Sequence, residues 1–147
     1  MRRDARTEGL RWLEQAEADR EGARLLFEGG SYHLACFVAQ QVTAKAIKAF
    51  IYAQGEEFVI GHSVEALCRL AATFDPDFET LRAAVAPLDG YYLPTRYPDS
   101  LPDSIPARIY TRVVAEEALR LTDQALHLLR TKLRPRSRPL NSACSIW

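Results

Sequence analysis

The residues from Ser31 to Gln54 constrain the fold of this 147-residue chain more than any other segment. No glycine or proline interrupts them, serine is a residue type that often caps helices, and Gly55 is a typical helix stop. Hydrophobic residues fall on almost every side of the predicted helix: Leu34, Ala35, Phe37, Val38, Val42, Ala46, Ile47, Ala49, Phe50 and Ile51. Such a helix lies at the centre of a bundle or is shared with a partner chain. We expect both, and therefore a homodimer.

Four further helices are expected around this one. No segment shows the alternation of a β-strand. Apolar residues instead recur at helical spacing over four ranges: 7–28, 63–73, 75–88 and 111–133. Gly29 and Gly30 end the first of these helices, and Pro87 bends or ends the third. Helix-starting residues precede the others: Ser63, Asp75-Pro76 and Thr111. Mostly short connections predict an all-α fold, an up-down antiparallel bundle of about five helices.

The chain is expected to form one domain with a tail. Its length and its 48% hydrophobic content are ordinary for a single globular domain. The bundle is expected over residues 1–133, and the basic, proline-broken residues 134–147 are expected to be flexible. Ahead of the last helix, Tyr91–Tyr110 carries a proline every four residues, which predicts a stiff, extended path without helix: Pro94, Pro98, Pro102 and Pro106.

Cysteine usage and charge limit the expected cellular compartment and the expected classes of binding partner. The three cysteines lack paired spacing, which predicts free thiols in a reducing, cytoplasmic compartment. We expect no signal peptide and no membrane partner, because no apolar stretch is judged to approach the ~20 residues that span a bilayer. All 19 acidic residues precede residue 124, whereas five of the 19 basic residues follow it. An acidic body argues against a broad nucleic-acid-binding face and leaves room for a small basic pocket.

A polar stripe on the central helix is the first candidate for ligand binding. Gln41, Lys45 and Lys48 are four and three residues apart, so they share one face of the helix. Amines in that position suit an anion or a phosphate, with further hydrogen bonds from the glutamine. The alternative is a solvated stripe on the outside of the bundle.

The tyrosine-rich loop supplies the second candidate. Arg96 lies among Tyr92, Tyr97 and Asp99, and a guanidinium fork suits phosphate while tyrosine rings can stack on a base. The alternative is structural, with Arg96 bonded to Asp99 or to loop carbonyls. His62 is interpreted as a turn residue that bonds a backbone carbonyl. We expect Arg96 and the two lysines to converge on one cationic recess for a nucleotide or a nucleic-acid end.

Four blocks resemble the HEPN (higher eukaryotes and prokaryotes nucleotide-binding) domain family over about residues 8–133. They are WLEQAEADREGARLLFEGGSYHLACFVAQQVTAKAIKAFIYAQGEE, GHSVEALCRL, YYLPTRYPD and YTRVVAEEAL. The resemblance implies a dimeric helical bundle that is involved with nucleotides or RNA. It also implies pairing with a minimal nucleotidyltransferase, often as a toxin–antitoxin couple.

Some family members are metal-independent ribonucleases with an arginine, a polar residue and then a histidine near the start of the last helix. Arg120 and His127 are the only weak candidates for that signature here, and Leu121 stands where a polar residue is expected. Two alternatives therefore remain beside nucleotide or RNA binding: a ribonuclease toxin and a non-catalytic protein-interaction subunit. No metal-ligand spacing is present, and we expect no cofactor apart from a possible bound nucleotide.

Overall fold

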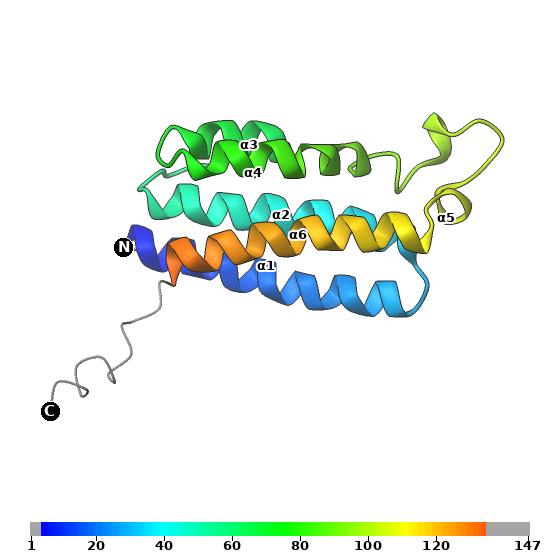
Figure 1. Cartoon of the computed structure of the whole chain (residues 1–147), viewed down its shortest axis with the longest axis horizontal. Helices are drawn as coiled ribbons and strands as arrows, with labels where there is room; N and C mark the ends of the chain where they lie inside the picture. Colours follow the sequence, from blue (N-terminus) through cyan, green and yellow to red (C-terminus); the bar gives the residue numbers. More distant parts are fainter. Residues whose placement is uncertain (1–3, 135–147) are drawn as a thin grey trace, which may run out of the picture.

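All regular structure in residues 4–134, the part of the chain that the computed structural model describes, is helical (Figure 1). The elements are α1 (Ala5–Glu28), α2 (Tyr32–Ala53), α3 (Val64–Ala72), α4 (Asp77–Val85), the 3₁₀ helices η1 (Ala86–Tyr91) and η2 (Pro98–Ser100), α5 (Pro106–Ile109) and α6 (Arg112–Leu133). The expected all-α bundle is confirmed. The prediction of a flexible tail over residues 134–147 falls almost entirely outside the described part, which ends at residue 134.

The three long helices α1, α2 and α6 lie side by side, and the shorter α3 and α4 cover another side of α2 (Figure 1). α1 and α2 run antiparallel across the tight connection at Gly29-Gly30, where Gly30 has a φ of 82°. A positive φ favours glycine, so this doublet ends α1 as its sequence predicts. α2 packs against α1, α3 and α6 and is the central helix of the molecule.

The position of α2 accounts for its unusual composition. Its apolar side chains are mostly buried within the chain itself, and among its large hydrophobic residues Leu34, at 36% exposure, is the exposed one. Burial within the chain thus accounts for the apolar sides of α2, and the homodimer that was expected from them stays a prediction. α2 also has the length and composition of a membrane span, contrary to the expectation from sequence, with a mean hydropathy of 1.3 over a window that is 67% buried in the bundle. That burial is typical of a core helix.

Helix starts follow the capping residues in part. The Ser63 side chain accepts a hydrogen bond from the Ala66 amide, and the Thr111 side chain accepts one from Val114, as predicted. Ser31 makes no such bond at the start of α2. α4 begins one residue after the expected proline, because Asp75 accepts from the Asp77 amide in a local turn.

The segment from Tyr91 to Tyr110 is not the extended path that its prolines were expected to enforce. It contains η2 and α5, and each of these short helices begins with a proline, Pro98 and Pro106. Proline lacks an amide hydrogen, but the first turn of a helix leaves that hydrogen without a partner in any case. The prolines therefore start short helices here, and at the end of α4 the chain passes into η1 just before Pro87.

Ion pairs join the basic end of α6 to the acidic body. Glu17 on α1 accepts hydrogen bonds from Arg130 and Arg134, and Lys132 pairs with Asp75 and Asp77. Burial alone would raise the pKa of Glu17, but the two arginines outweigh burial and lower the pKa. The described part of the basic C-terminal segment is thus largely neutralised by acidic partners.

Candidate functional site

Arg96 lies within a cluster of aromatic rings at the end of the bundle that holds the start of α2. Its guanidinium carbon is 4.2 Å from the centre of the Phe37 ring, 4.8 Å from that of Tyr92 and 5.3 Å from that of Tyr97. Its Nε donates to the Tyr92 carbonyl at 2.8 Å. No carboxylate in the described part of the chain pairs with Arg96, so of the two structural alternatives the bond to Asp99 is not found and the bond to a loop carbonyl is. The terminal guanidinium nitrogens remain available to an anion.

Tyr92 connects this cluster to the linker between α2 and α3. Its ring is tilted against Phe37 on α2, and it stacks on His62 with 5.3 Å between ring centres and 16° between planes. The expected bond from the His62 side chain to a backbone carbonyl is not found among the described residues: its ring faces Tyr92, and its own carbonyl accepts from Gln40. Phe37 and His62 were not predicted as site residues. No sequence signal could have identified them, because neither is near Arg96 along the chain.

An open hollow of about 780 Å³ adjoins the cluster. Its lining comes from the end of η1 and the loop that follows: Asp89, Gly90, Tyr92, Leu93, Pro94, Tyr97, Asp99 and Ser100. Tyr97 is 50% exposed, so part of this side chain is accessible to a ligand. Asp99 makes no hydrogen bond with the described residues and presents its carboxylate to solvent. The predicted residues Tyr92, Arg96, Tyr97 and Asp99 are thus brought together.

A buried polar network fixes the base of this loop. Gln40 is fully buried and donates to the His62 carbonyl and to the Asp89 carboxylate, at 2.6 and 3.2 Å. The same carboxylate accepts from the Val64 and Glu65 amides at the start of α3. Asp89 therefore joins α2, α3 and η1 immediately before the tyrosines, and it was not predicted.

The stripe on α2 is formed as its spacing predicts, but its members have different partners. Gln41 donates to the Gln40 side chain at 2.7 Å, and Lys45 pairs with Asp19 on α1 at 2.5 Å. Lys48 is only 9% exposed and lies over the Trp12 ring, with its amine 5.8 Å from the ring centre. Burial lowers the pKa of Lys48, and the charge of Lys45 lowers it further.

Arg96 and the two lysines do not form the single recess that was expected. Phe37, which Arg96 covers, precedes Lys48 by eleven residues, which corresponds to about 16 Å along a helix. The loop docks on the first half of α2, whereas α1 contacts the lysines through Asp19 and Trp12. The cations therefore occupy two positions along one face of α2.

The weak catalytic candidates Arg120 and His127 do not form a site with one another. Arg120 is paired with Glu117 on the same helix, and its side chain is 62% exposed. His127 is exposed two turns further along α6, and Leu121 is buried in the core. The pairing with Glu117 raises the pKa of Arg120. This is the geometry of a solvated helix face.

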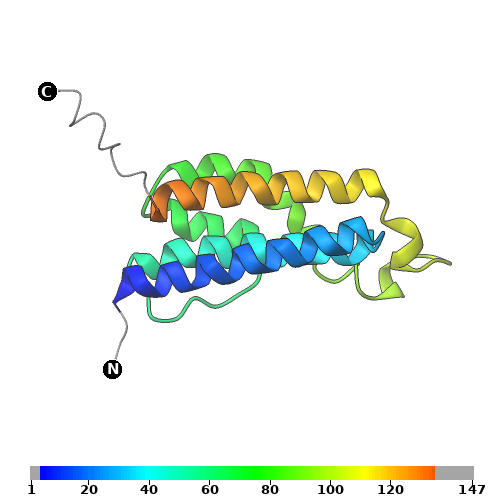
Figure 2. The same ribbon diagram turned by 90° about the horizontal axis from the view of Figure 1, so that it is seen from below.

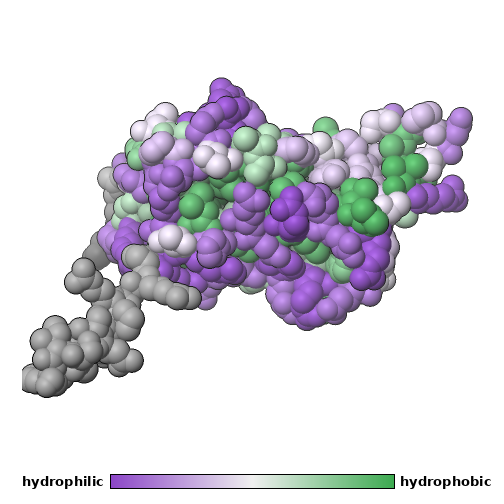
Figure 3. All heavy atoms as spheres, in the orientation of Figure 1, coloured by the Kyte–Doolittle hydropathy of each residue, from purple (hydrophilic) through white to green (hydrophobic). Residues whose placement is uncertain are grey.

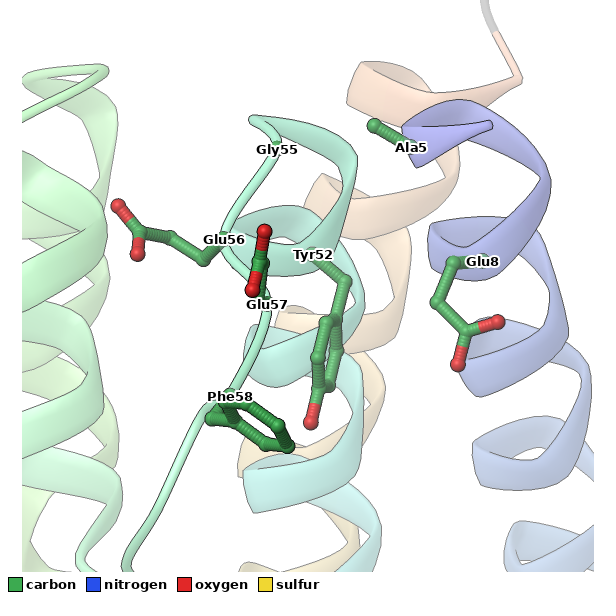
Figure 4. A pocket seen from close by; sticks show the side chains of 7 residues that line it. All are labelled: Ala5, Glu8, Tyr52, Gly55, Glu56, Glu57 and Phe58. Atoms are coloured by element: carbon green, nitrogen blue, oxygen red, sulfur yellow. The ribbon is translucent and has the colours of Figure 1, made fainter. Parts of the chain in front are cut away.

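A second hollow of about 620 Å³ lies where α1 begins and α2 ends (Figure 4). Its lining is acidic and aromatic: Ala5, Glu8, Tyr52, Gly55, Glu56, Glu57 and Phe58. Figure 4 shows Glu56 pointing away from Glu8, on the opposite side of the Tyr52 ring. Over residues 4–134 no three histidine, cysteine or acidic side chains are grouped as metal ligands.

Comparisons with known proteins agree with this architecture. The HEPN domain family model matches residues 10–132. TT1696 from Thermus thermophilus is 40% identical, with a TM-score of 0.76 over 85% of this chain and 98% of that chain. ST0689, an archaeal HEPN homologue, is 33% identical, with a TM-score of 0.64 over 90% of this chain and 99% of that chain. The comparison with curated proteins found no significant match.

The family match covers the central helix, the Arg96 loop and nearly all of α6. Both solved structures are similar in sequence as well as in fold, and they are covered almost completely. The resemblance seen in the four sequence blocks is thereby confirmed, and the chain belongs to the HEPN domain family.

Proposed function

We propose that this HEPN domain is a nucleotide- or RNA-binding module whose ligand is recognised at Arg96. The observation that carries the proposal is the guanidinium itself, which lies among three aromatic rings and has no carboxylate partner in residues 4–134. Most other described lysines and arginines are paired with acidic side chains, often three or four residues away, as in Arg24–Glu21 and Arg112–Glu116. An unpaired guanidinium held in place by rings is suited to binding an anion.

The surrounding groups suit a nucleotide rather than a bare anion. A phosphate would accept hydrogen bonds from the terminal nitrogens of Arg96, while the half-exposed ring of Tyr97 offers a stacking surface for a base. Asp99 lines the adjoining hollow without a hydrogen bond to the described residues, so its carboxylate would repel a second phosphate and could accept donors from a base edge. The acidic body beyond the hollow limits binding to this location.

The proposal includes partners. Family membership supports two of them: a minimal nucleotidyltransferase, as in a toxin–antitoxin couple, and a second copy of this chain. A candidate surface exists where α5 meets the start of α6, because Ile105, Ile109 and Val113 are 40%, 48% and 72% exposed. Figure 3 shows hydrophobic patches at this end of the molecule, and others toward the middle and the opposite end of the same face.

Calorimetric titration of the full chain with ATP, GTP and a short single-stranded RNA tests the binding proposal. The wild type is expected to bind at least one of them, and Arg96→Ala to weaken that binding by roughly tenfold or more, which is the effect of losing a charge-assisted pair. Arg96→Lys keeps the charge and loses the fork, so an intermediate affinity is expected. Arg108→Ala is the matched control, since Arg108 on α5 also lacks a carboxylate partner among the described residues but contacts none of the three rings.

Two results would contradict the proposal. One is the absence of binding by a folded wild type, which would leave the non-catalytic interaction subunit as the better description. The other is equal affinity in the wild type and in a folded Arg96→Ala variant, which would place the ligand elsewhere. The thermal unfolding midpoint of each variant separates loss of contact from loss of fold.

A further inference from the structure

We propose that the ligand is a single-stranded oligonucleotide that lies along the exposed face of α2, from Arg96 at one end to Lys48 at the other. This inference rests on the proposed function and names the ligand class: a strand of several nucleotides rather than a mononucleotide. It assigns a binding role to Lys48 and Trp12, which are separated from the Arg96 cluster along the helix.

The face in question is a continuous strip of α2. Phe37, Gln41, Lys45 and Lys48 fall within about 80° of one another around the helix axis. The first three are partly exposed, because α6 packs on the other side of α2. Figure 2 shows α6 on one side of α1 and α2, with the linker of residues 54–63 on the opposite side. The strip is thus bordered by α1 and by this linker, which passes His62 on its way to α3.

Each end of the strip carries a cation over an aromatic ring, and neither cation has a carboxylate partner within residues 4–134. Arg96 covers Phe37, and Lys48 covers Trp12, which itself stacks on Tyr52 with 5.0 Å between ring centres. Lys45, between them, is held by Asp19 and adds little net charge. The strip therefore repeats one unit, an unpaired cation over an aromatic ring, at two separate points.

The amine of Lys48 reaches solvent although most of its side chain is buried. Among the described residues, no fully buried side-chain nitrogen or oxygen lacks a hydrogen-bond partner. Lys48 has no hydrogen bond or ion pair there, so its amine is at the surface of the strip. Burial and the nearby Lys45 lower its pKa, in keeping with an ammonium that has no carboxylate partner among the described residues. A phosphate would supply that charge.

The spacing sets the length of the strand. Phe37 and Lys48 are eleven residues apart, or about 16 Å along the helix. With a rise of about 3.4 Å for each stacked nucleotide, and more when the strand is extended, the span corresponds to roughly three to five nucleotides. Beyond Lys48 and Tyr52, the lining of the hollow in Figure 4 contains no lysine or arginine that could bind a phosphate. The strip therefore ends at Lys48.

The test is the length dependence of affinity, measured by calorimetry with the full chain and 5′-phosphorylated oligouridylates of one to six nucleotides. Affinity is expected to rise about tenfold or more between one and four nucleotides and then to level off. Lys48→Gln, which keeps an amide over Trp12, is expected to remove most of this rise while leaving the affinity for the mononucleotide unchanged. The slope of log affinity against log salt for the tetranucleotide is expected to fall by about 0.7.

Arg108→Gln is the control, because it removes a charge that lies off the strip, and its length dependence is expected to match the wild type. Deoxyuridylates of the same lengths determine whether the strand is RNA alone or either nucleic acid. A flat length dependence, or a full rise in folded Lys48→Gln, overturns the inference and leaves a mononucleotide site at Arg96. Absence of binding at every length contradicts the proposed function itself.

Discussion

At the scale of single residues, Asp89 has the largest structural role among the polar side chains near the site. Its carboxylate accepts from Gln40, from the Ser63 hydroxyl and from the amides of Val64 and Glu65. Two of these donors are helix-start amides without a partner in their own helix, and one belongs to a fully buried glutamine. Removing the acceptor leaves the two amides and one hydrogen of the Gln40 amide without this partner, and an unsatisfied buried donor costs more than the bond itself contributes.

Asp89→Ala is therefore expected to lower the free energy of unfolding by about 2–4 kcal/mol, measured by urea denaturation at neutral pH. Asp99→Ala is the matched control, since Asp99 lines the same hollow but makes no hydrogen bond with the described residues, and its effect is expected within about 0.5 kcal/mol. Equal unfolding free energies for the two variants would show that the network around Asp89 does not stabilise the fold.

The candidate site could be predicted from sequence only where its residues are close along the chain. Arg96, Tyr92 and Tyr97 are within five residues of one another, and the loop was identified from its composition. Phe37 and His62 could not be identified, because they reach the site through the docking of that loop on α2. The same docking separates Arg96 from Lys48. The shared face of Gln41, Lys45 and Lys48 on α2 was predicted correctly, but the expectation that the Arg96 loop would converge with it was wrong.

At the scale of elements, the close crossing of α1 and α2 depends on Gly9. A Cβ atom at this position would lie 2.6 Å from the Ala49 carbonyl oxygen and 2.8 Å from the Ala53 Cβ. Both contacts are too short for any residue other than glycine, and the first involves backbone that cannot rotate away. Gly22, further along the same helix, has no such neighbour within 4 Å.

Substitution by alanine is expected to have opposite effects at these two positions. Gly9→Ala should lower the free energy of unfolding by about 1–3 kcal/mol, because α1 must move away from α2. Gly22→Ala should raise it by about 0.5–1 kcal/mol, because alanine has the higher helix propensity and meets no obstacle. Urea denaturation of both variants provides the comparison, and stabilisation by Gly9→Ala would mean that the two helices cross less closely than described.

The order and number of the long helices could be predicted because apolar spacing and capping residues are local properties. Residues 7–28 and 111–133 match α1 and α6 to within two residues at either end. The path from Tyr91 to Tyr110 could not be predicted in this way. Proline is excluded from the interior of a helix but is accepted in its first turn, where η2 and α5 have it. Whether such a segment begins short helices depends on contacts made after the bundle has formed.

At the scale of the whole molecule, apolar side chains are exposed in the linker after α2, with Phe58 at 82% and Ile60 at 88%, and at the end of the bundle where α5 meets α6. Val113 is 72% exposed at the start of α6, and Ile109 is 48% exposed on α5 directly before it. Contiguous apolar side chains at a surface commonly mark protein interfaces. This end also holds the Arg96 loop, so a partner bound there would lie beside the candidate site.

Static light scattering of the chain at micromolar concentration is expected to give the mass of a dimer, and Val113→Asp to shift it to that of a monomer. A charge in the centre of an apolar interface is left without solvent or a partner, which costs several kcal/mol and removes the association. Leu70→Asp is the control, because Leu70 is 42% exposed on α3 and lies outside this surface. The same variant tests the minimal nucleotidyltransferase that is proposed as a partner. If this partner binds the same surface, Val113→Asp abolishes that complex as well. A monomeric wild type that still binds the nucleotidyltransferase assigns the surface to the second partner, whereas dimers that persist in Val113→Asp place the interface elsewhere.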